Sequence, residues 1–103
     1  MPVYLLWEFE TPKEEERNKK RHKLIDEVNI PYIERKVKEG VKWEILDMSD
    51  GTGRVVELQT FETMEDFEKI WRDEEFHKMV TQYCRTVDNV SVRILRPAIS
   101  IRP

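Results

Sequence analysis

Gly53-Arg-Val-Val-Glu-Leu-Gln-Thr-Phe61 and the Glu62-Thr-Met-Glu-Asp-Phe67 that follows are the two segments that decide the fold of this chain. In the first, residues of high β-propensity alternate between two faces, which predicts a strand. In the second, Thr63 and Asp66 stand three residues apart and resemble a capping box with Asp in place of Glu. The pattern therefore predicts a strand that leads through a sharp turn into a helix.

The apolar stripe of this helix changes position halfway along. Phe67, Ile70 and Trp71 share one side. A second stripe, rotated by about half a turn at about 100° per residue, consists of Phe76, Met79, Val80, Tyr83 and Val87. Because Asp73 is suited to cap a new helix, the sequence predicts two short helices that meet at Arg72–Glu74.

Three more strands are expected, at residues 3–9, 41–47 and 90–95. The turn signal Asp50-Gly-Thr-Gly53 predicts a hairpin between the second of these and the strand at 53–61. One face of the first strand is wholly apolar: Val3, Leu5, Trp7 and Phe9.

The remaining segment predicts a long helix over residues 12–39. Thr11 is expected to be its N-cap and Pro12 its first residue. Its apolar stripe slips near Asn29–Pro31, where proline removes a backbone donor, so an interruption is expected there. Gly40 is suited to the left-handed cap that ends such a helix.

The order of elements is β-α-β-β-α-β, in one ferredoxin-like α+β domain spanning residues 1–103. With right-handed crossovers it predicts a four-stranded antiparallel sheet, strand order 4-1-3-2, with two interrupted helices on one face. The other, open face is expected to carry Tyr4, Leu6, Glu8, Lys42, Glu44, Leu46, Val55, Glu57, Gln59, Phe61, Arg93 and Leu95.

Composition excludes several classes of protein. Eighteen basic and 21 acidic residues give a net charge of −3, which argues against nucleic-acid or anionic-membrane binding. The lone Cys84 cannot form an internal disulfide or a cysteine-based metal site. Because no apolar run approaches about 20 residues and no signal peptide is evident, we expect a cytoplasmic protein. No cofactor is expected.

The segments 53–58, 61–71 and 75–76 resemble the dimeric α+β barrel superfamily, particularly its antibiotic-biosynthesis-monooxygenase-like and NIPSNAP-like groups. The resemblance implies a dimer with two sheets face to face and a pocket between each sheet and its helices. Members of this superfamily oxidise aromatic polyketide-like substrates without a cofactor, bind or degrade haem, or isomerise lactones. Haem-degrading members carry a histidine four residues after the phenylalanine that matches Phe76, where this chain has Val80.

Four aromatic residues are candidates for lining a ligand pocket between sheet and helices: Trp7, Trp43, Trp71 and Tyr83. The alternative is that these rings simply fill the core. His77, Tyr32 and Tyr83 are the candidates for proton transfer near such a pocket. No combination of residues indicates a metal site or a nucleophile with its base.

These observations favour a homodimeric protein that binds a small apolar or aromatic molecule, with cofactor-free monooxygenase or isomerase activity as the enzymatic option. They do not decide whether it is an enzyme, and a non-catalytic binding or assembly module is the alternative. An RNA-recognition-like binder shares the topology, but Glu8, Glu44 and Glu57 would repel phosphate. The dimer is expected to form through the open sheet face, with Arg93 near Glu8 or Glu57 and residues 97–103 extended across the partner.

Overall fold

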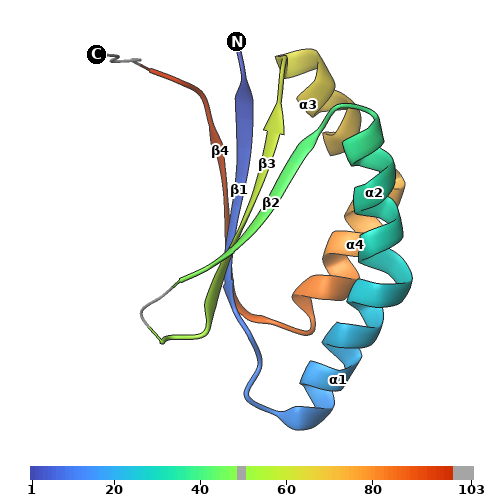
Figure 1. The fold of residues 1–103 in the computed structure, drawn as a ribbon, viewed down its shortest axis with the longest axis vertical. Coiled ribbons are helices and arrows are strands. Elements are labelled where there is room, and N and C mark those ends of the chain that lie inside the picture. The colour runs from blue at the N-terminus through green and yellow to red at the C-terminus, as the bar shows by residue number, and fades with distance from the viewer. Residues whose placement is uncertain (49–50, 99–103) are drawn as a thin grey trace.

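The computed structural model describes residues 1–48 and 51–98. It shows one antiparallel sheet, in the order β2-β3-β1-β4, with all helices packed on one face (Figure 1). The elements are β1 Val3–Glu10, α1 Glu15–Leu24, the π-helical turn η1 Ile25–Asn29, α2 Ile30–Lys38, β2 Lys42–Asp47, β3 Arg54–Phe61, α3 Met64–Trp71, α4 Glu74–Cys84 and β4 Asp88–Leu95. The predicted fold class and strand order are confirmed. Most of the 97–103 tail and Asp50 of the predicted hairpin signal lie outside the described residues.

The first helical segment begins later than predicted and is interrupted close to the predicted place. It starts at Glu15, because Thr11 does not cap it: the backbone N and Oγ1 of Thr11 instead donate to the carbonyl of Gly53 at 3.1 and 3.3 Å. The interruption is the π turn η1, which ends one residue before the helix resumes at Ile30. A π turn widens the helix by one residue per turn, so the apolar stripe shifts without the helix ending.

The second helical segment is divided between α3 and α4, as predicted. Thr63 Oγ1 accepts a hydrogen bond from Asp66 N at 3.1 Å, which caps α3. Asp73 caps α4 by accepting from Glu75 N at 3.0 Å. The same carboxylate accepts a 2.8 Å hydrogen bond from the Tyr32 hydroxyl, so α2 is fastened to the junction of α3 and α4.

The face assigned to β3 from the sequence was wrong. In the observed register Trp7 lies opposite Glu57, and Leu5 lies opposite Gln59. Directly paired residues share a face, so alternate residues of β3 point toward the helices with the apolar face of β1. These inward residues are Val55, Glu57, Gln59 and Phe61, in place of the open-face position that the sequence predicts for them.

The open face consequently differs from the prediction along β3. Its apolar residues are Tyr4, Leu6, Leu46, Val56, Leu58 and Leu95. Arg54 pairs with Glu8 at 3.3 Å and with Glu10 at 3.0 Å. A cluster of Arg93 with Glu57 on this face is therefore ruled out, because Glu57 points to the other side of the sheet.

The core lies between the sheet and the helices. Its main cluster consists of Val3, Leu5, Tyr32, Phe61, Phe67, Ile70, Phe76 and Met79. A smaller cluster of Phe9, Val55 and Val87 packs with Tyr83 nearer the other end of the sheet. A hollow lies between these two clusters. It is found where the inward polar residues of β3, Glu57 and Gln59, interrupt the apolar packing.

Candidate functional site

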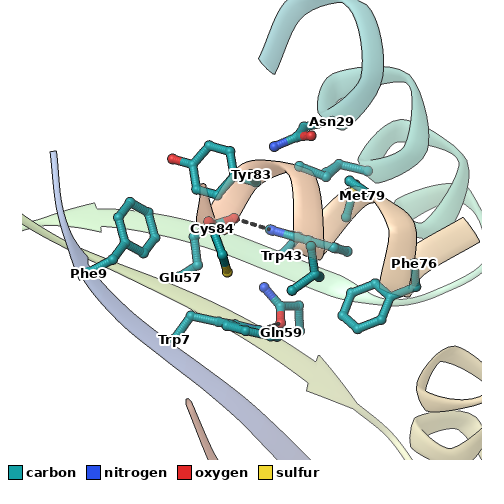
Figure 2. A pocket seen from close by; sticks show the side chains of 12 residues that line it. Trp7, Phe9, Asn29, Trp43, Glu57, Gln59, Phe76, Met79, Tyr83 and Cys84 are labelled. Carbon is teal, nitrogen blue, oxygen red and sulfur yellow. Dashed lines mark hydrogen bonds between the residues drawn. The ribbon is translucent and has the colours of Figure 1, made fainter. Parts of the chain in front are cut away.

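The hollow between the two core clusters, here called the aromatic hollow, is a narrow cavity of about 40 Å³ that opens to solvent. Figure 2 shows side chains from both layers pointing into it. The lining residues are Trp7, Phe9, Asn29, Ile33, Trp43, Glu57, Gln59, Phe76, Met79, Val80, Tyr83 and Cys84. The walls are mostly aromatic and aliphatic with a few polar groups, as is typical of small-molecule sites.

Two tryptophans in the aromatic hollow are held by the inward polar residues of β3. Trp43 Nε1 donates a 3.0 Å hydrogen bond to Glu57 Oε1, drawn as the dashed line in Figure 2. Trp7 Nε1 donates a 2.7 Å hydrogen bond to Oε1 of Gln59, which is 1% exposed. Each bond satisfies an indole N–H that would be costly to bury alone and fixes the plane of its ring.

Burial perturbs the acid–base groups of the aromatic hollow. Desolvation raises the pKa of Glu57, and the hydrogen bond from Trp43 and the positive charge of Arg21 oppose this shift only in part. Desolvation also raises the pKa of Tyr83 to about 12. The pKa of Cys84 is raised by burial and then by the charge of Glu57. A thiol and a phenol with raised pKa values stay protonated near neutral pH, so neither Cys84 nor Tyr83 acts as a proton acceptor there.

The π turn η1 contributes to the wall of this region. Asn29, its last residue, lines the aromatic hollow, and its side-chain oxygen is buried with no hydrogen-bond partner among the described residues. A second, larger hollow of about 210 Å³ adjoins the first and shares Glu57, Asn29 and Tyr83 with it. Arg21 and Asp47 contribute charged groups to this outer hollow, whose lining is otherwise mostly apolar.

Three of the four residues predicted to bind a ligand meet in the aromatic hollow: Trp7, Trp43 and Tyr83. The fourth, Trp71, lies outside it. Its ring stacks on Phe67 with centroids 5.6 Å apart and is partly exposed at the surface of α3. The break between α3 and α4 separates Trp71 from the inner stripe of α4, which supplies Tyr83.

Of the three predicted proton-transfer residues, only Tyr83 lines the aromatic hollow. His77 is exposed, and its ring contacts Trp71, with Nε2 against the Trp71 backbone oxygen. Tyr32 is buried, donates to Asp73, and has its pKa raised first by desolvation and then by this hydrogen bond. Its hydroxyl therefore serves the packing of the helices.

Sequence reasoning missed Asn29, Glu57 and Gln59 as lining residues of the aromatic hollow. Glu57 and Gln59 alternate in phase with the apolar Val55 and Phe61, a signal that could have placed them inward. They were placed on the open face because a polar residue on a strand usually faces water. Asn29 gave no such signal, since its direction depends on the π turn.

Within residues 1–48 and 51–98, no group of three or more His, Cys, Asp or Glu side chains is arranged to hold a metal ion. Among the helices of the same residues, none has the length and apolarity needed to cross a membrane.

Comparison with known proteins finds likeness in structure only. No family model and no curated protein sequence matches the chain. A point mutant of SnoaB, a cofactor-independent oxygenase from Streptomyces nogalater, superimposes with a TM-score of 0.70 at 10% identity, covering 99% of this chain and 98% of that one. Rv0793 from Mycobacterium tuberculosis gives a TM-score of 0.69 at 14% identity, covering 99% and 100%.

A NIPSNAP family protein from Agrobacterium tumefaciens is similar over 95% of this chain and 94% of its own, with a TM-score of 0.60 and 14% identity. At such identities the likeness concerns the fold. The expected resemblance is confirmed at that level: the chain has the ferredoxin-like α+β fold shared by antibiotic-biosynthesis-monooxygenase-like and NIPSNAP-like structures.

Proposed function

We propose that the protein binds a small apolar or aromatic molecule in the aromatic hollow. The observation that carries this proposal is the convergence of Trp7, Trp43 and Tyr83, from three different elements, on a space that also contains Glu57. The indole rings are fixed by hydrogen bonds to β3, so the walls are preorganised for a flat ligand.

The enzymatic form of this proposal is cofactor-free oxidation or isomerisation of the bound molecule. Its support is the chemistry of the aromatic hollow, in which Glu57 is a shielded carboxylate able to accept a proton from a ligand. The likeness to SnoaB, itself described as a cofactor-independent oxygenase, supports the same reaction class. The second candidate is a binding module without catalysis, which the same aromatic walls also favour.

We also propose that the protein forms a symmetric homodimer through the open sheet face. The helices leave that face uncovered (Figure 1), and its apolar residues extend over all four strands. A lone domain rarely leaves so extended an apolar surface in water. No nucleic-acid or membrane partner is proposed, and the cytoplasmic location stays a prediction.

Ligand binding can be tested by native mass spectrometry of the purified protein, followed by identification of any released molecule. Val80→Phe, which places a ring in the aromatic hollow, should abolish the bound mass. Thr81→Phe adds the same ring to the exposed side of α4 and should leave the mass unchanged. Circular dichroism confirms that both variants are folded. Equal retention by both would refute this site.

Catalysis is tested separately once a ligand is known. Oxygen consumption or product formation by the purified protein with that ligand alone, without added cofactor, identifies the enzyme. Binding without turnover identifies the non-catalytic module.

A further inference from the structure

The side chains of Glu57 and Gln59 form a matched acceptor and donor at the floor of the aromatic hollow. They are two residues apart on β3, so they lie on the same face of the strand and are neighbours there. Both line the hollow, and Figure 2 shows both reaching into it from the same strand. What each can offer a ligand follows from the hydrogen bonds that already engage them.

Glu57 has one carboxyl oxygen engaged and one available. Trp43 Nε1 donates to Oε1, and within residues 1–48 and 51–98 this is the only hydrogen bond recorded for the carboxyl group. No salt bridge within 4.0 Å joins it to a lysine or arginine of the described residues. Among those residues, Oε2 therefore remains as an acceptor that no protein donor occupies.

Gln59 is oriented by its partner. An indole N–H can only donate, so the atom of Gln59 that meets Trp7 Nε1 at 2.7 Å must be the amide oxygen. The amide nitrogen then points away from Trp7. In Figure 2 it is the blue atom directed into the hollow, and no acceptor is recorded for it among the described residues.

The other groups facing this pair do not supply the missing partners. Tyr83 and Cys84 on α4 remain protonated, Arg21 on α1 acts on Glu57 only at longer range, and Asp47 on β2 lines the outer hollow. An acceptor and a donor side by side, within aromatic walls, are complementary to a group that donates and accepts through one atom. A hydroxyl is such a group.

We propose that Glu57 and Gln59 together select ligands that carry a hydroxyl group on a flat apolar ring, with the hydroxyl donating to Glu57 Oε2 and accepting from Gln59 Nε2. The proposal rests on the proposed binding function and names the recognition element within that site. Trp43 and Trp7 act as positioning residues that hold the acceptor and the donor in place. An analogue without the hydroxyl leaves both buried groups unpaired, which is why the discrimination should be large.

The test uses three probes of nearly equal size: p-cresol, its isomer anisole, and toluene. Each is titrated into the full-length protein while the three tryptophan indole N–H signals are followed by ¹H–¹⁵N NMR. Binding in the aromatic hollow should shift the signals of Trp7 and Trp43, whereas Trp71, outside it, is the internal reference. We expect p-cresol to bind about tenfold or more tightly than anisole and toluene, the equivalent of one hydrogen bond.

Glu57→Gln tests the acceptor. The variant keeps an oxygen for Trp43 Nε1 and presents an N–H₂ where Oε2 stood, so the preference for p-cresol over anisole should fall about tenfold. Glu44→Gln, the same change on the open face of β2, should leave the preference intact. Equal affinity of the unmodified protein for all three probes would overturn hydroxyl selection while leaving apolar binding in place. Failure of all three probes to shift Trp7 and Trp43 would refute the binding function and this inference with it.

Discussion

Trp43 and Glu57 join neighbouring strands β2 and β3 through a 3.0 Å hydrogen bond from the indole Nε1 to Oε1. A glutamate on the inner face of a sheet is ordinarily unfavourable. Here its hydrogen bond to Trp43 makes Glu57 part of the wall of the aromatic hollow. It compensates the buried carboxyl only in part, since the pKa of Glu57 stays raised by desolvation. A carboxyl kept at such a cost to stability is more readily understood as functional than as structural.

The raised pKa of Glu57 predicts a specific dependence of stability on pH. The folded chain holds this proton at pH values where the unfolded chain, with a pKa of 4.5, has lost it. The free energy of unfolding should therefore fall as pH rises from about 4.5 through the folded pKa, and the loss is complete above it. Glu57→Gln removes this contribution, so urea denaturation should show the variant gaining on the unmodified protein as pH rises through that window. Glu44→Gln is the control, and a pH-independent difference for Glu57→Gln would contradict the prediction.

The hydrogen bond between Tyr32 and Asp73 predicts how much stability is lost when α2 is no longer joined to the junction of α3 and α4. Tyr32→Phe should lower the free energy of unfolding by about 1 to 2 kcal/mol, because the partly buried carboxylate loses its 2.8 Å donor. The remaining cation, Lys36 Nζ, is 3.9 Å from Asp73 Oδ2 and compensates little. In an Asp73→Ala background the same change should cost almost nothing. If urea denaturation shows that the losses in free energy of unfolding from Tyr32→Phe and Asp73→Ala simply add in the double variant, the bond contributes no stability.

The open sheet face predicts the oligomeric state. The unmodified chain should sediment at about twice its mass of 12.5 kDa at micromolar concentration. Leu58→Lys, at the centre of the face, should give monomers because an unpaired buried charge costs several kcal/mol. Val37→Lys, at a 49% exposed position on α2, is the control and should remain dimeric. A monomeric unmodified chain would end the dimer proposal.

The same face predicts no measurable RNA binding. Arg54 is paired with Glu8 and Glu10, and Lys42 lies 3.5 Å from Glu44, so little positive charge is free to meet phosphate. With a net charge of −3, the electrostatic part of non-specific affinity is absent. A gel shift with single-stranded RNA at micromolar protein and physiological salt should show no complex. A salt-sensitive complex would show that the charge argument is wrong.

Periodicity predicted the division of both helical segments because apolar stripes must face a single core. It could not predict that the interruption of the first segment would be a π turn. The stripe slips in both cases, but only Asp73 offers a cap. The start of the first helix was misplaced because Thr11 is used by the hairpin loop at Gly53, a contact between residues far apart in sequence.

The candidate site was predicted only in its aromatic part. Large aromatic residues on an apolar strand face are recognised from the alternation of the sequence, and this pattern identified Trp7 and Trp43. Trp71 was included because the sequence located the break between α3 and α4 but did not show to which side the break turns the ring of Trp71. Glu57 and Gln59 were missed because polar residues of a strand usually face water. This rule fails where a polar group has a buried hydrogen-bond partner, and such partners are identified only once the register of the strands is known.

The placement of β1 has a consequence for how the chain is made. Of the four strands of this sheet, β1 leaves the ribosome before the others, yet its two neighbours are β3 and the fourth strand, β4. Its first neighbour is synthesised only after residue 54 and its second only after residue 88, so both edges of β1 are paired only once β4 has been made. Stalling translation before Asp88 would leave one edge of the strand that carries Trp7 open to other nascent chains. Completion of this sheet thus depends on β4, the last of its four strands to be synthesised.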